Sequence, residues 1–196
     1  DGGHNDGART RWSRDRVSLC CGHIFFLTYC ALAVLFYRER VLYDTSVFLN
    51  TGPLLDGTFF RALGRLPVQI PPQLLPLLAV KLGASSQAAA MAYSLNFALF
   101  HYGFWLLLAH ALRRIDLGAA FIACILIYLV HNNIFIQADV MHAAGFLFVF
   151  LAAAEAPLGA TRNDRLLRIS VLLLSALAAC FSHPLMLALT IYYALY

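Results

Sequence analysis

The chain has 196 residues, of which 61% are hydrophobic and only 12% are charged. Soluble domains are roughly half apolar and a quarter charged, so this composition excludes an ordinary water-soluble fold and predicts a membrane protein. The formal net charge of +4 comes mostly from arginines beside apolar segments, which indicates membrane topology and contact with the lipid bilayer and its anionic lipids; no nucleic acid partner is implied.

Apolar segments that reach or approach membrane-spanning length follow one another along the chain. A transmembrane helix needs about 20 apolar residues. We therefore predict an all-α fold, a polytopic transmembrane helical bundle that forms a single domain. The chain begins with Asp and stops within its last apolar segment, so we expect it to be the N-terminal part of a longer protein. The predicted spans are residues 17–37, 88–112, 117–135, 139–156, 166–181 and an incomplete sixth at 184–196.

Closely spaced arginines fall at one end of these segments. They precede the first span at residues 9–16, follow the second at Arg113 and Arg114, and precede or begin the fifth at residues 162–168. Short arginine-rich loops stay in the cytoplasm. We therefore predict an integral protein of the bacterial inner (plasma) membrane, with a cytoplasmic N-terminus and its chemistry at the outer face.

The long stretch between the first two spans, residues 38–87, is predicted to be an outer loop. Glycines and prolines interrupt it, yet it is too apolar for a disordered linker. Four apolar residues from Phe59 to Leu66 recur at helical spacing, which predicts a helix over residues 58–66 in the plane of the membrane interface. A short apolar piece at residues 74–82 has Pro76 in its first turn, and we expect it to lie on the membrane surface or dip into it.

Asp44 follows the first predicted span on the outer side. A carboxylate held against a membrane surface can lose solvation, which raises its pKa and suits a general base that activates a hydroxyl. The alternative is that Asp44 caps an interfacial helix that runs through Phe48 and Leu49. Its place close behind the first span makes it the strongest catalytic candidate.

A second polar group, His131, Asp139 and His142, flanks the next predicted outer turn. Asp139 and His142 are three residues apart and would share a helix face. This group could contact an acceptor or a pyrophosphate, hold a divalent metal, or be ordinary interfacial polarity. No metal-binding motif is present and the five cysteines lack CxxC spacing. The sequence therefore requires no cofactor, although a divalent metal is compatible with these residues.

One further histidine, His101, lies in the middle of the second predicted span, near Asn96. Ionisable groups at membrane depth are costly and usually face the interior of a helix bundle. We therefore expect His101 to hydrogen-bond a neighbouring helix.

The first half of the chain resembles a known enzyme family. A first span, an Asp just beyond it, a long outer loop and the run Pro71-Pro72-Gln73-Leu74-Leu75-Pro76-Leu77, followed by Lys81-Leu82-Gly83, are similar to the opening of GT-C glycosyltransferases. The likeness is to the protein mannosyltransferase and aminoarabinose transferase branches, and it covers about residues 17–114. The family commonly has an acidic pair at the Asp, whereas Asp44 is followed by Thr45 and Ser46.

The resemblance implies an integral membrane glycosyltransferase that moves a sugar from a polyprenyl-phosphate donor to an acceptor at the outer face. It implies Asp44 as the catalytic residue, and Arg61, Arg65 and Lys81 as cations that contact the lipid phosphate. These cations could instead anchor the loop at lipid headgroups. Two other functions fit the same topology: a transporter or flippase for an envelope precursor, and a non-catalytic subunit of a membrane complex.

Overall fold

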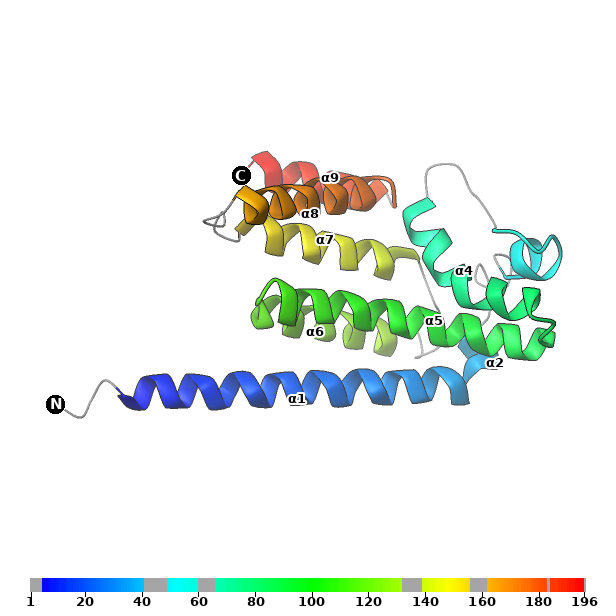
Figure 1. The fold of residues 1–196 in the computed structure, drawn as a ribbon, viewed down its shortest axis with the longest axis horizontal. Helices are drawn as coiled ribbons and strands as arrows, with labels where there is room; N and C mark the ends of the chain where they lie inside the picture. The colour runs from blue at the N-terminus through cyan, green and yellow to red at the C-terminus, as the bar shows by residue number, and fades with distance from the viewer. Residues whose placement is uncertain are drawn as a thin grey trace.

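The computed structural model describes residues 5–40, 49–59, 66–131, 139–155, 162–182 and 184–195. The secondary structure within these ranges is helical and contains no strand, so the prediction of an all-α fold is confirmed for them. Figure 1 shows that the long helices alternate in direction along the long axis of the molecule, each running opposite to the one before. They are α1 (Asn5–Leu35), α5 (Ser86–Leu106), α6 (Ile115–His131), α7 (Asp139–Glu155), α8 (Arg162–Cys180) and α9 (Pro184–Leu195).

Each predicted span overlaps one of these helices, and α1, α5, α6 and α8 begin before the predicted start. The stretch Asp15–Leu35 of α1 is the one helix in the described ranges that is long and apolar enough to cross a membrane by length and composition. The apolar stretches Ile115–Tyr128 and Met141–Glu155 are shorter. Membrane insertion of the remaining helices stays a prediction from the sequence.

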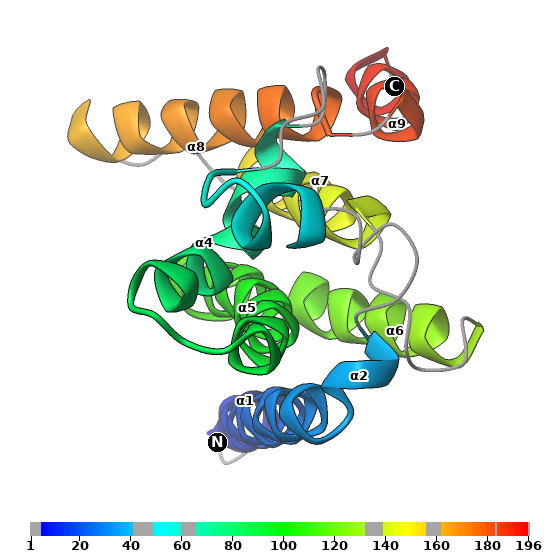
Figure 2. The ribbon, with the colours of Figure 1, turned by 90° about the vertical axis from the view of Figure 1, so that its right-hand side faces the viewer.

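The helices are stacked in tiers, as Figure 2 shows: α1 lies at one side, α5 and α6 next to it, then α7, and finally α8 and α9. The core between α1, α5, α6 and α7 is aromatic. Phe26 and Phe121 are fully buried, and Trp105 is almost so. Rings of this size bury the most apolar area per residue, so they dominate the packing of these helices.

Helix α5 begins with a side-chain cap and ends in a π-helical turn that leads into α6. Ser85 caps the start of α5, where its hydroxyl accepts a hydrogen bond from Ala88 N at 3.2 Å. The other end of α5 widens into a π-helical turn, η2 (Leu107–Ala111), and Arg113 follows with a φ of 54°. This left-handed conformation is common for glycine and rare for other residues, so the turn holds Arg113 in a strained backbone geometry.

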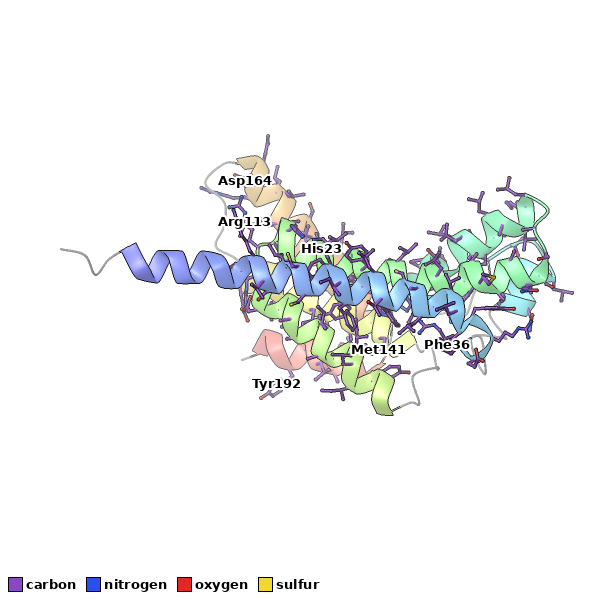
Figure 3. The ribbon with its side chains drawn as sticks, turned by 90° about the horizontal axis from the view of Figure 1, so that it is seen from below. His23, Phe36, Arg113, Met141, Asp164 and Tyr192 are labelled. Carbon is purple, nitrogen blue, oxygen red and sulfur yellow. The ribbon has the colours of Figure 1, made fainter. Side chains whose placement is uncertain are left out.

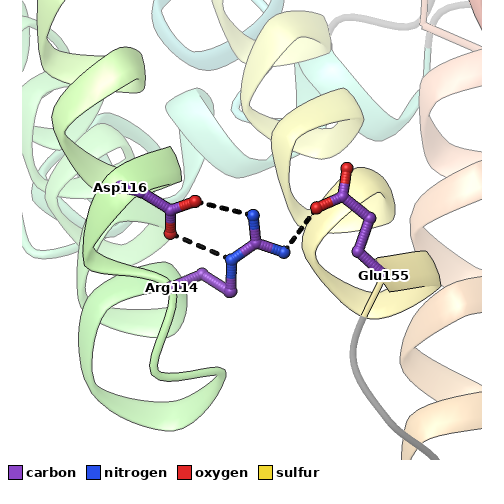
Figure 4. Close-up of polar contacts among 3 residues, drawn as sticks. All are labelled: Arg114, Asp116 and Glu155. Atoms are coloured by element: carbon purple, nitrogen blue, oxygen red, sulfur yellow. Dashed lines mark hydrogen bonds and ion pairs between the residues drawn. The ribbon is translucent and has the colours of Figure 1, made fainter.

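A cluster of three charges ties the start of α6 to the end of α7 (Figure 4). The Arg114 guanidinium donates to both carboxylate oxygens of Asp116, at 2.9 and 2.7 Å, and to Glu155 at 2.6 Å. The hydrogen bonds from Arg114 hold the pKa of Asp116 below its usual value, and the two carboxylates raise the pKa of Arg114. The cluster joins the start of α6 to the last residue of α7, which lies 41 positions after Arg114.

The Pro-rich segment forms a longer helix than we predicted. Helix α4 (Leu66–Lys81) begins well before residue 74 and carries Pro76 in its middle rather than in its first turn. Each proline removes a helical N–H donor. Side-chain amides supply further donors nearby: Gln73 donates to Gln69 O at 2.6 Å, and Asn96 of α5 donates to Pro71 O at 2.5 Å.

Helix α4 lies obliquely at one end of the bundle and packs on α5 (Figure 1). The predicted interfacial helix over residues 58–66 falls mostly outside the described residues. Thr58 and Phe59, which are described, are not helical, and α4 starts at Leu66. Two short elements complete this end of the structure, α2 (Tyr37–Arg40) and the π-helical turn η1 (Asn50–Leu54).

Candidate functional site

Two histidines from different helices stack in the interior of the bundle. His101 of α5 and His142 of α7 have ring centroids 4.8 Å apart and an angle of 25° between the ring planes. Both side chains have no exposed surface. His142 lies in the first turn of α7, where its side chain is buried against α5. Its predicted place near the outer face stays a prediction.

Aromatic rings enclose this histidine pair. Phe97 meets both imidazoles edge-on, at centroid distances of 4.6 and 4.2 Å, and Phe100 lies 5.0 Å from His142. None of the four ring nitrogens forms a hydrogen bond of normal geometry with a described residue. His101 thus faces the interior of the bundle, as predicted. Its contact with the neighbouring helix α7 is a stacked ring of His142, where we had predicted a hydrogen bond. Buried polar atoms without partners are costly and usually have a specific reason.

A buried arginine ends α2, the short helix that follows α1. Arg40 is only 2% exposed. Its Nε donates to the Ser94 hydroxyl at 2.9 Å, and its Nη2 donates to the Tyr29 hydroxyl at 3.2 Å. The guanidinium carbon also lies 4.9 Å from the centre of the Tyr29 ring. The Ser94 hydroxyl in turn donates to Ala33 O at 2.7 Å.

The partners of Arg40 in the described part of the chain are neutral hydroxyls and an aromatic face; no carboxylate pairs with it there. A buried guanidinium carries a large desolvation cost, which hydroxyl contacts offset only in part. An anion is the complement that such a cation lacks, and the guanidinium fork matches the geometry of a phosphate.

Tyr29 connects the arginine to the histidine pair. Its hydroxyl contacts Arg40, and its ring stacks on His101 with a centroid distance of 6.3 Å. Arg40, Tyr29, His101 and His142 therefore form a continuous chain of contacts from α2 through α1 and α5 to α7. We call these four residues together with Ser94 the polar column.

Arg40, Tyr29 and Ser94 are not among the site residues that the sequence pattern predicts. One signal could have pointed to Arg40. Arg38 and Arg40 follow the first span at the end opposite to every arginine-rich loop, so they break the charge pattern that fixes the topology. An arginine on that side needs a reason other than topology.

Of the predicted site residues, only His142 has a described side chain that joins the polar column. The structure does not bring the others together within the described ranges. Asp44, Arg61 and Arg65 lie outside the described residues. Lys81 is exposed at the last residue of α4. His131 ends α6 and Asp139 begins α7, and only their backbone is described. Across the described ranges, no three His, Cys, Asp or Glu side chains form a group that could hold a metal ion.

Fold and polar column together define an all-helical protein with one clearly membrane-length helix and a buried, carboxylate-free arginine beside an interior histidine pair. Comparison of the chain with protein-family models, with curated proteins and with solved structures found no match.

Proposed function

We propose that this chain belongs to a polytopic membrane glycosyltransferase that uses a polyprenyl-phosphate-linked sugar as its donor. The observation that carries the proposal is the buried Arg40 with no carboxylate partner in the described structure. When the sugar is transferred, the polyprenyl phosphate of the donor is the leaving group, and the enzyme must stabilise its negative charge. A fixed cation in a water-poor site does this well.

The outer surfaces of the helices support insertion of the whole bundle. Large apolar side chains point away from the core on helices other than α1, for example Ile127 of α6 at 71% exposed and Leu174 of α8 at 67% exposed. Other exposed leucines of α8 include Leu166, Leu167, Leu173 and Leu177. Soluble proteins rarely expose large contiguous apolar patches, whereas lipid tails solvate them.

The placement of charge supports one orientation. Because successive helices alternate in direction (Figure 1), Arg113, Arg114, Arg165 and Arg168 all fall at the end of the bundle where α8 begins. We call this the arginine-rich end, and the proposal assigns it to the cytoplasm. Arg40 and α4 then lie toward the outer face, where a polyprenyl phosphate would present its sugar.

The chemistry assigns distinct roles to two residues. Arg40, positioned by Ser94 and Tyr29, would bind the donor phosphate and stabilise its charge as the glycosidic bond to the phosphate breaks. Asp44 would accept the proton of the attacking acceptor hydroxyl. Four residues of extended chain span about 14 Å at most, so the chain keeps the Asp44 backbone within that distance of Arg40.

The test is sugar transfer by the full-length protein reconstituted in liposomes with polyprenyl-phosphate sugars, measured as release of polyprenyl phosphate. Arg40→Gln should lower the rate by on the order of 100-fold, the usual effect of removing one charge-stabilising donor. Arg38→Gln is the matched control: Arg38 is exposed and its Nε donates to the hydroxyl of the neighbouring Tyr37 at 2.8 Å, so this variant should keep the wild-type rate.

Two results would overturn the proposal: wild-type transfer by a folded Arg40→Gln variant, or no consumption of any polyprenyl-phosphate sugar by the wild type. The unfolding midpoint of each variant shows whether it is folded. Arg40→Lys, which keeps the charge but loses the planar fork, should retain an intermediate rate.

A transporter or flippase is the second candidate, and the His101 and His142 pair favours it. Ionisable side chains inside a bundle often line proton or substrate pathways. A transporter would move a labelled envelope precursor across liposomes without releasing polyprenyl phosphate from any donor. The same reconstituted protein therefore distinguishes the two functions.

A further inference from the structure

A cavity of about 440 Å³ opens at the arginine-rich end, between the α5 to α6 connection and the first turns of α8. Figure 3 shows two of its lining residues, Arg113 and Asp164, close to each other at that end of the molecule. The cavity is separate from the polar column, whose Arg40 ends α2, just beyond the C-terminal end of α1 and away from the arginine-rich end.

The lining of this cavity is divided by polarity. Arg113, Asp164 and Arg168 supply its charged part. Leu107, Leu167 and other aliphatic residues supply an apolar part. A ligand that satisfies both parts carries a charged group joined to an apolar body, which is the chemistry of a lipid and not that of a small inorganic ion.

The charge of the cavity favours an anion. Two arginines and one aspartate give it a formal charge of +1. Arg113 has no carboxylate partner in the described structure, whereas its neighbour Arg114 takes both Asp116 and Glu155. Among the described residues, Arg113 is also the only one other than glycine that has a positive φ. Strained backbone of this kind persists where the surrounding structure fixes it, and it is frequent at binding sites.

We propose that this cavity binds the headgroup of an anionic phospholipid of the cytoplasmic leaflet, with its phosphate held by Arg113 and Arg168. The inference rests on the membrane orientation proposed above, and it does not depend on glycosyl transfer. The cytoplasmic leaflet is rich in anionic lipids, and basic cavities between helices on that side bind their headgroups. The apolar part of the lining takes the first carbons of the acyl chains.

The test is lipid binding by the delipidated full-length protein in neutral detergent, measured as the rise in its unfolding midpoint on titration with phosphatidylglycerol. Phosphatidylglycerol should raise the midpoint, and neither phosphatidylcholine nor inorganic phosphate should do so. Arg113→Gln should weaken the apparent affinity for phosphatidylglycerol by about tenfold, the effect of losing one charge-assisted contact. Arg165→Gln is the control, because it removes the same charge from α8 at an exposed residue outside the cavity lining.

An equal effect of Arg113→Gln and Arg165→Gln would overturn the proposal, since it would mean nonspecific attraction to the surface charge. Equal stabilisation by phosphatidylcholine, or by inorganic phosphate, would also overturn it. If Arg113→Gln does not fold, Arg168→Gln tests the same cavity with the same expected loss. Binding is read independently of sugar transfer, so a protein with no transferase activity can still support or refute this site.

Discussion

Gly22 of α1 lies against the indole ring of Trp105 on α5, so closely that a β-carbon at position 22 would stand 2.0 Å from Cζ2 of that ring. In the same way, a β-carbon added to Gly145 of α7 would stand 2.3 Å from Cδ2 of Phe104 on α5. Such distances are far below van der Waals contact. The absence of a side chain at these two positions therefore sets how closely α1 and α7 approach α5.

Gly22→Ala and Gly145→Ala should each destabilise the protein by about 1–3 kcal/mol, because the added methyl overpacks a rigid aromatic contact. Gly103→Ala is the control. A β-carbon there meets nothing within 4 Å, so alanine should be neutral or slightly stabilising through its higher helix propensity. Unfolding midpoints in detergent measure the difference, and equal midpoints for Gly22→Ala and Gly103→Ala would contradict the packing described.

Arg114→Gln should destabilise the protein by about 1 kcal/mol or less, since the ion pairs of Arg114 with Asp116 and Glu155 are partly exposed and screened by water. Arg113→Gln, measured without lipid, should change the free energy of unfolding less. A larger loss of stability from Arg113→Gln than from Arg114→Gln would contradict the conclusion that the ion pairs at this turn are those of Arg114.

The same ion cluster predicts a pH dependence. The pKa of Asp116 is lowered in the folded protein, so its ion pair contributes stability above the unfolded-state pKa of about 3.9, and this is lost as the pH falls through the lower folded pKa. The stability gap between wild type and Arg114→Gln should therefore be largest above about pH 4 and narrow below it. Unfolding in denaturant at a series of pH values measures this gap. A gap that widens on acidification would be the wrong sign.

His142→Phe should leave the unfolding midpoint unchanged or raise it, because the imidazole has no hydrogen bond to a described residue and a benzyl group of similar shape removes two unsatisfied nitrogens. His23→Phe is the comparison. His23 Nδ1 lies 2.6 Å from the Tyr102 hydroxyl, so this variant should lower the midpoint. Equal losses in both variants would show that His142 has a polar partner.

Accessibility labelling in a cysteine-free background tests the orientation. A cysteine at Thr58 should react with an impermeant maleimide added outside the cell, and one at Arg165 should react only from the cytoplasm. Both positions are exposed, so access to the reagent is decided by the side of the membrane. Labelling of both from the same side would refute the proposed topology.

Asp44→Asn tests the catalytic assignment that the family resemblance implies. If Asp44 is the general base, the variant should keep expression and donor binding but lose orders of magnitude in transfer rate, because an amide cannot take the acceptor's proton. If Asp44 only caps a helix, Asn should serve nearly as well. Near-wild-type transfer by this variant would remove Asp44 from the mechanism.

The positions of the long helices could be read from the sequence because they depend on local properties. An apolar run of about 20 residues forms a helix wherever it is buried in lipid or protein, and each predicted run overlaps one helix. The length of the Pro-rich helix α4 was predicted wrongly. Proline disfavours a helix through its local geometry, but α4 is also held by contacts with α5, including the hydrogen bond from the Asn96 amide to Pro71 O.

The polar column was decided by tertiary structure. Arg40 is buried because α5 brings Ser94 to it from 54 positions away in the sequence, and His142 is buried because α7 packs its first turn on α5 beside His101. Residue spacing within one helix fixes which side chains share a face, but it does not determine which face meets which partner. That choice depends on packing between distant segments, here set by close contacts such as Gly22 with Trp105. The sequence by itself therefore determined where the helices lie and which end carries the arginines, and only the packed structure decided which polar side chains meet inside the bundle.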